Sequence, residues 1–68
     1  MRVLVNGDPR ELPDRVTVAD VVVVVGAPPD GRGVAVAVDG EVVPRGDWPA
    51  TRVHEDQQIE VLQAVQGG

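Results

Sequence analysis

The sequence predicts an α+β domain in which one helix lies across one face of a mixed sheet of about five strands. The first observation is composition: seventeen valines, one Trp and no Phe or Tyr favour strands, because valine is stiff at χ1. The second is the alternating segment Val34–Val38, followed by the hairpin signal Asp39-Gly40. The third is a helix start at Thr17, with Asp20 one turn later and Gly26 at the expected end.

The chain of 68 residues is long enough for one small domain, which we expect over residues 1–65, with residues 66–68 as a flexible tail. Without cysteine, neither a disulfide nor a thiolate zinc site can stabilise it. Ser, Lys and Tyr are also absent, and the hydroxyls are limited to Thr17 and Thr51. Because nearly every side-chain nucleophile is missing, we expect no enzymatic activity and no catalytic residue.

The net charge is −5, and the six arginines are scattered along the chain. Such a surface is a poor partner for nucleic acid but suits a protein with a basic docking face, mainly by speeding encounter. No apolar run reaches the length of a membrane span, and the N-terminus meets charge too early for a signal peptide, so we expect a cytoplasmic protein. His54 has no second ligand beside it, which argues against a metal site.

The N-terminal segment predicts a hairpin. Met1–Val5 alternates weakly and predicts a first strand, and Asn6-Gly7-Asp8-Pro9 is a dense turn signal. A short return strand, roughly Arg10–Leu12, should pair with the first, and Pro13-Asp14 should end the hairpin.

Local signals disagree over the segment that follows. Thr17 and Asp20 form a capping box at the start of a helix, whereas the five β-branched residues Val21–Val25 favour a strand. We favour the helix, because the cap precedes the valines and Gly26 stands where a C-terminal glycine should be.

A second hairpin is the clearest element of the chain. The loop before it contains Gly31-Arg32-Gly33, which is too short a pattern for a phosphate cradle. Val34–Val38 alternates, and Glu41–Val43 returns after the turn. The valines of the first strand should face the helix, which places Ala35 and Ala37 on the opposite face, where small side chains leave a shallow surface for another protein.

The last strand is predicted from Gln58 to Val65. The side chains expected on its helix side are Ile59, Val61 and Val65. Leu62 and Ala64 fall on the opposite face. Between the hairpin and this strand, Pro44–Thr51 should be irregular, with one turn of 3₁₀ helix, and Trp48 should cap the aliphatic core rather than contact a partner.

The predicted order is strand, strand, helix, strand, strand, strand. One helix across one mixed sheet is the simplest arrangement that buries the apolar face of each. This is the β-grasp, or ubiquitin-like, architecture.

The chain ends in Gln66-Gly67-Gly68, directly after the predicted last strand. We interpret the carboxylate of Gly68 as the working group, presented by Gly67 and Gln66. To react with a phosphate of ATP, such a carboxylate must enter a narrow cleft of another protein, where a neighbouring Cβ would clash, and glycine adopts backbone angles closed to other residues. The alternative is a frayed terminus without a function.

Five segments spread over the chain match the pattern of one known family: Arg2–Gly7, Thr17–Asp20, Val34–Trp48, Ile59–Val61 and Gly67-Gly68. In these segments the sequence resembles the ThiS family of thiamine-biosynthesis sulfur carriers. The most specific part is Val43-Pro44-Arg45 followed by Trp48, a form not expected in other diglycine carriers such as the small subunit of molybdopterin synthase.

The resemblance implies that a ThiF-like adenylyltransferase uses ATP and magnesium to convert the Gly68 carboxylate to an acyl-adenylate. Sulfur from a donor such as a cysteine desulfurase would displace AMP and leave a thiocarboxylate on Gly68, and a ThiG-like thiazole synthase would accept the sulfur. The chain would then be a protein cosubstrate with no bound cofactor. Two alternatives stay open: a carrier for molybdopterin or cysteine synthesis, and a β-grasp module that only binds its partners.

The candidate partner-contact residues are Leu62, Ala64, Val65, Ala35, Ala37 and Arg45. For Leu62 and Ala64 we favour a partner surface over chance exposure, because two strands contribute apolar residues to that face. Arg45 either pairs with a carboxylate of the partner or is solvated.

Overall fold

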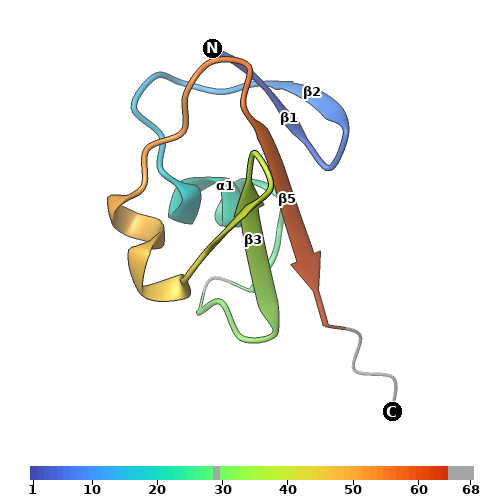
Figure 1. Cartoon of the computed structure of the whole chain (residues 1–68), viewed down its shortest axis with the longest axis vertical. Coiled ribbons are helices and arrows are strands. Elements are labelled where there is room, and N and C mark those ends of the chain that lie inside the picture. The colour runs from blue at the N-terminus through green and yellow to red at the C-terminus, as the bar shows by residue number, and fades with distance from the viewer. Residues whose placement is uncertain (29, 65–68) are drawn as a thin grey trace.

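A computed structural model of the chain describes residues 1–28 and 30–64. Over these residues a five-stranded sheet is covered on one face by a single α-helix (Figure 1). The elements are β1 (Arg2–Val5), β2 (Asp8–Glu11), α1 (Val18–Val24), β3 (Val34–Val38), β4 (Glu41–Val43), the 3₁₀ helix η1 (Arg45–Ala50) and β5 (Gln58–Gln63). The predicted order of elements and the β-grasp fold are confirmed.

The sheet is mixed, and its strand order is β2-β1-β5-β3-β4. The two hairpins, β1–β2 and β3–β4, are antiparallel, and β5 runs between them. It pairs parallel to β1 on one side and antiparallel to β3 on the other. The C-terminal strand therefore holds the two hairpins together in the centre of the sheet. It ends at Gln63, and its predicted end at Val65 lies outside the described residues.

The first hairpin corrects one prediction. The return strand begins at Asp8, not at Arg10, and ends at Glu11, so Leu12 lies beyond it. Asn6 and Gly7 both have positive φ, 51° and 84°, and form a two-residue turn that leaves Asp8 directly opposite Val5. Proline fits the return strand because β2 is an edge strand, where a missing N–H need not break a pairing bond.

The helix forms as the capping signals predict. The N–H of Asp20 donates to the Thr17 hydroxyl at 3.3 Å, and the N–H of Thr17 donates to the Asp20 carboxylate at 2.9 Å. At the other end Gly26 has φ +79°, and hydrogen bonds from residues 26 and 27 back to residues 23 and 22 satisfy the last carbonyls. The N-cap is worth about 1 kcal/mol. Together with the burial of Val21 and Val22 in the core, it holds as a helix a run whose local propensity favours a strand.

The core is almost entirely aliphatic. Among the described residues, the buried apolar side chains are Val3, Val5, Leu12, Val16, Val18, Val21, Val22, Ala27, Val36, Trp48, Val53, Ile59 and Val61. Trp48 is 4% exposed, and its Nε1–H donates to the carbonyl of Val43 at 2.9 Å, which satisfies its polar edge. The predicted core role of Trp48 is confirmed, and the helical turn that carries it is longer than expected, because η1 spans six residues.

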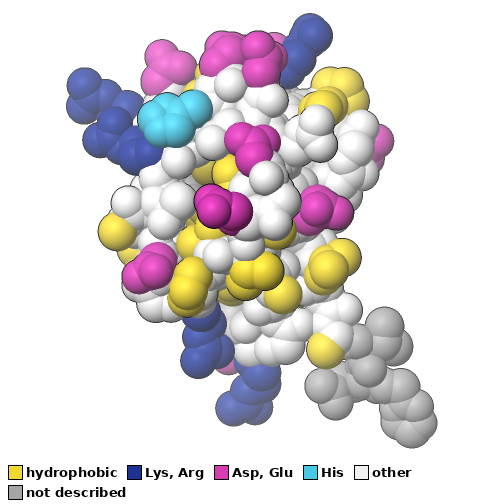
Figure 2. Space-filling model, in the orientation of Figure 1, with side chains coloured by type: hydrophobic (Ala, Val, Ile, Leu, Met, Phe, Trp, Pro, Cys, Tyr) yellow, Lys and Arg dark blue, Asp and Glu magenta, His cyan; other side chains and the backbone are white. Residues whose placement is uncertain are grey.

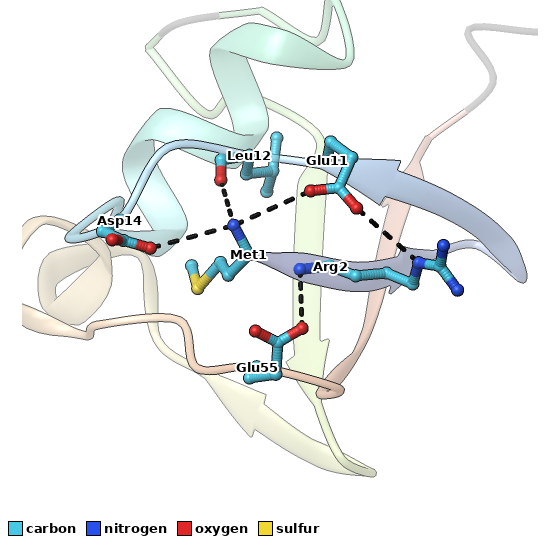
Figure 3. A network of polar contacts seen from close by, with 6 residues as sticks. All are labelled: Met1, Arg2, Glu11, Leu12, Asp14 and Glu55. Atoms are coloured by element: carbon cyan, nitrogen blue, oxygen red, sulfur yellow. Dashed lines mark hydrogen bonds and ion pairs between the residues drawn. The ribbon is translucent and has the colours of Figure 1, made fainter.

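The N-terminus is tied to two distant parts of the chain (Figure 3). The Met1 ammonium donates to the carbonyl of Leu12 at 2.7 Å and lies 3.8 Å from the carboxylate of Glu11. The N–H of Arg2 donates to the carboxylate of Glu55 at 2.8 Å. These contacts fix β1 between the edge strand and the turn that leads into β5, at the end of the sheet where β5 begins (Figure 1).

Candidate functional site

The face of the sheet away from α1 is built by the alternation of β3 and β5. Val36 and Val61 pair across the strands and are buried on the helix side, so their neighbours point the other way. Ala35 pairs with Leu62 on this outer face, and Ala37 pairs with Glu60. For the residues that the structure describes, the predicted division of each strand into a core side and an outer side is confirmed; Val65 lies outside them.

The outer face is open and partly apolar. Leu62 has 64% of its surface exposed, and Val42 on the edge strand β4 has 73%. Figure 2, in which α1 lies behind the sheet, shows hydrophobic side chains gathered in the lower half of the face, while acidic side chains are more frequent in the upper half. Exposed apolar side chains that cluster on one face are typical of a surface that another protein covers.

A shallow depression lies at the end of β5 on this face. Its lining residues are Gly31, Gly33, Val34, Ala35, Arg45, Leu62, Gln63 and Ala64. The N–H of Ala64 donates to the carbonyl of Gly33 at 2.6 Å, which holds the end of the β5 segment against the start of β3. Apart from Arg45, the lining carries no charge, and it offers no hydroxyl, thiol or amine. The depression can bind another surface but has no side chain for covalent catalysis.

Arg45 is placed at the rim of the depression by packing. Gly31 has φ +75°, and a Cβ added there would lie 2.5 Å from Cδ of Arg45 and 2.8 Å from Cζ3 of Trp48. The arginine stem therefore runs across a surface that only glycine leaves free. The guanidinium Nη1 donates to the carbonyl of Asp30 at 3.3 Å. The result is one oriented cation beside an apolar surface on a chain whose net charge is −5.

The depression brings together four of the residues predicted from the sequence: Ala35, Arg45, Leu62 and Ala64. Ala37 lies on the same face but outside the depression. The predicted residues Val65, Gln66, Gly67 and Gly68 lie outside the described residues.

Sequence reasoning missed two contributors to the depression, Gly31 and Gly33. It considered them only as part of a phosphate cradle and rejected that interpretation. The sequence did contain a usable signal, because two glycines just before a hairpin indicate backbone positions with positive φ. Gly31 and Gly33 both have positive φ.

In residues 1–28 and 30–64, no three His, Cys, Asp or Glu side chains lie together as metal ligands. Within the same part of the chain, no helix is long and apolar enough to cross a membrane.

The fold and this outer face define the chain as a ubiquitin-like β-grasp protein with an exposed apolar surface at the end of its last strand. The model of the ThiS family matches residues 3–68, and the chain therefore belongs to the ThiS family.

Two solved structures are similar over the whole chain. One is the crystal structure of a thiamine biosynthesis protein (ThiS) from Geobacter metallireducens, with 27% sequence identity, all of both chains covered and a TM-score of 0.81. The other is the solution structure of a thiamine biosynthesis protein from the same organism, with 27% identity, 88% of that chain covered and a TM-score of 0.83. No protein with a curated description matches the sequence.

Proposed function

We propose that this chain is a sulfur carrier for thiamine biosynthesis and delivers the sulfur of the thiazole ring. The observation that carries the proposal is that the family match runs from residue 3 to residue 68 and so includes the terminal Gly67-Gly68. The similar structures from Geobacter metallireducens, whose names place them in thiamine biosynthesis, support the same pathway.

The proposed chemistry takes place on the carboxylate of Gly68. A carboxylate oxygen attacks the α-phosphorus of ATP, pyrophosphate leaves, and an acyl-adenylate remains. Hydrosulfide then attacks the acyl carbon and AMP leaves, so one oxygen of the carboxylate is replaced by sulfur. Where the donor carries the sulfur as a persulfide, the first product is an acyl disulfide, and a thiol reductant cleaves it to the thiocarboxylate. A ThiF-like enzyme supplies the ATP and magnesium site, a donor such as a cysteine desulfurase supplies the sulfur, and a ThiG-like thiazole synthase accepts it. The chain is their protein cosubstrate.

In this proposal the outer face is the docking surface for the activating enzyme. Leu62, Ala35 and Ala64 supply apolar area that association removes from water. Arg45, whose stem already rests on Gly31, loses little conformational freedom when it pairs with a carboxylate of the enzyme. The rest of the acidic surface speeds encounter with a basic region of the partner.

The test is the intact mass of the protein after incubation with the ThiF-like enzyme, ATP, magnesium and a sulfide source. We expect a gain equal to the replacement of one oxygen by sulfur, mapped to the C-terminal peptide. A chain that lacks Gly68 is the control and should fold normally but gain no sulfur. If neither sulfur nor AMP is found on the full chain, with an activating enzyme proven active on another carrier, the protein is a binding module and the tail has no chemical role.

A further inference from the structure

The central strand β5 extends beyond the strand on one of its sides. Toward β3 it is paired along its whole length, up to Gln63 opposite Val34. Toward β1 the pairing covers only Gln58 and Ile59, because β1 ends at Val5. Figure 1 shows the lower part of β5 continuing past the β1–β2 hairpin. The end of a central strand is therefore also a short free edge.

The direction of each main-chain group on β5 follows from its hydrogen bonds. Gln58 and Ala64 bond on the β3 side, where the carbonyl of Gln58 accepts from Asp39 at 2.7 Å and the N–H of Ala64 donates to Gly33 at 2.6 Å. The carbonyl of Ile59 accepts from the N–H of Asn6 at 2.8 Å, on the β1 side. Because this direction alternates along a strand, residues 61 and 63 also present their N–H and C=O to the β1 side.

Asn6 closes part of this edge. Its carboxamide Oδ1 accepts from the N–H of Val61 at 2.8 Å, and its Nδ2 donates to the carbonyl of Val61 at 3.2 Å. One side chain thus replaces the missing residue of β1. Gln63 lies two residues further along β5. No residue in 1–28 or 30–64 forms a hydrogen bond with its N–H or its C=O on the β1 side. Within residues 1–28 and 30–64, the free edge therefore consists of one donor and one acceptor, both on Gln63.

We propose that an extended segment of the activating enzyme pairs with the main chain of Gln63 and adds a strand to the sheet beside β5. The inference rests on the proposed function, since it names the mode by which the same partner docks. An N–H and a C=O that point the same way from one residue are matched by one residue of another extended chain. When the enzyme covers the neighbouring Leu62, these peptide groups lose water and need that pairing.

The chemistry of the edge favours an enzyme segment over a second copy of this chain. If the β5 edges of two copies paired, they could exchange main-chain hydrogen bonds only at Gln63. In each copy the carboxamide of Asn6 already bonds the N–H and the C=O of Val61. Such a pair would also bring together two chains that each carry a net charge of −5 and repel one another. Glu60 is exposed and forms no ion pair among the described residues, so a basic side chain on the added segment complements it. The occupant is thus an extended, basic segment of the enzyme.

The substitution Gln63→Pro tests the pairing directly, because proline removes the N–H of residue 63, which makes no bond to β3. Gln63→Ala is the matched control, since it removes the side chain and keeps the N–H. In ATP–pyrophosphate exchange catalysed by the ThiF-like enzyme, we expect the KM for Gln63→Pro to exceed that for Gln63→Ala about tenfold, because both variants lack the glutamine side chain and only the proline variant also lacks the N–H. Equal KM values for the two variants would overturn the strand addition.

Amide hydrogen exchange of the unsubstituted protein gives a second test that needs no variant. The Gln63 amide should exchange rapidly in the free protein and be protected in the complex with the enzyme without ATP, whereas an unchanged rate overturns the pairing. If Gln63→Pro fails to fold, this measurement decides. A free protein that sediments as a dimer, and becomes monomeric as Gln63→Pro, would assign the edge to a second copy. If the unsubstituted chain is never adenylated, the proposed function fails instead.

Discussion

Asp39 and Gln58 bind each other reciprocally across the sheet. The N–H of Asp39 donates to the carbonyl of Gln58 at 2.7 Å, and the N–H of Gln58 donates to the Asp39 carboxylate at 2.9 Å. Asp39 has φ 49° and begins the turn between β3 and β4. One turn residue therefore fixes the first residue of β5 and with it the register of this central strand.

Replacement of Asp39 tests its positive-φ turn conformation and its side-chain bond together. Asp39→Ala should lower the free energy of unfolding by about 1–2 kcal/mol, because it removes the acceptor and places an alanine at positive φ. Asp39→Asn keeps an oxygen acceptor and tolerates positive φ, so its loss should stay below about 0.5 kcal/mol. Urea denaturation of the two variants measures both values, and equal losses would contradict the role of the acceptor oxygen.

Trp48 should contribute more through packing than through its hydrogen bond. Trp48→Phe removes the donor to the Val43 carbonyl and should cost about 1–2 kcal/mol. Trp48→Ala also leaves a cavity under η1 and should cost about 3–5 kcal/mol. The unfolding must be followed by circular dichroism, because Trp48 is the one tryptophan of the chain. A similar cost for both variants would mean that the hydrogen bond dominates.

The features predicted from the sequence are those that short segments determine. The capping box at Thr17 and the Asp39-Gly40 turn each act within a few residues, and alternation alone places Ala35 and Leu62 on the outer face. The predicted start of β2 was wrong. Proline disrupts a central strand but is tolerated in an edge strand, and only the strand order of the whole sheet shows that β2, which contains Pro9, lies at the edge.

The missed parts of the candidate site depend on contacts between distant residues. Gly31 matters because Arg45 and Trp48 pack over it, and no local pattern reveals this. The bond between Asn6 and Val61 joins residues 55 positions apart, so Asn6 was interpreted only as a turn residue. Such contacts become visible only once the strands are placed beside one another.

Gly31 and Gly40 form a matched pair that isolates the packing under Arg45. Both have positive φ, +75° and +85°, but a Cβ at Gly40 meets nothing within 4 Å. Gly40→Ala should therefore cost about 1 kcal/mol for backbone strain alone. Gly31→Ala adds a collision with Arg45 and Trp48 and should cost about 1–3 kcal/mol more. Thermal denaturation of both variants tests this, and a Gly31→Ala protein no less stable than Gly40→Ala would contradict it.

The outer face can be tested with two exposed apolar residues of nearly equal accessibility. Leu62, on the outer face, is 64% exposed, and Val23, on α1, is 62% exposed. If the outer face docks the activating enzyme, Leu62→Asp buries an unpaired charge in the complex and should raise the KM for adenylation at least about tenfold, with little change in kcat. Val23→Asp places the same charge outside the proposed interface and should leave KM within about twofold.

Both variants should keep most of their stability, because each replaced side chain is already largely in water. Equal urea midpoints would exclude misfolding as the cause of a higher KM. Three outcomes are distinct in meaning. A higher KM for Leu62→Asp alone assigns docking to the outer face. A higher KM for Val23→Asp alone assigns docking to the helix side. Similar KM values for the two variants leave the tail as the principal element that the enzyme recognises.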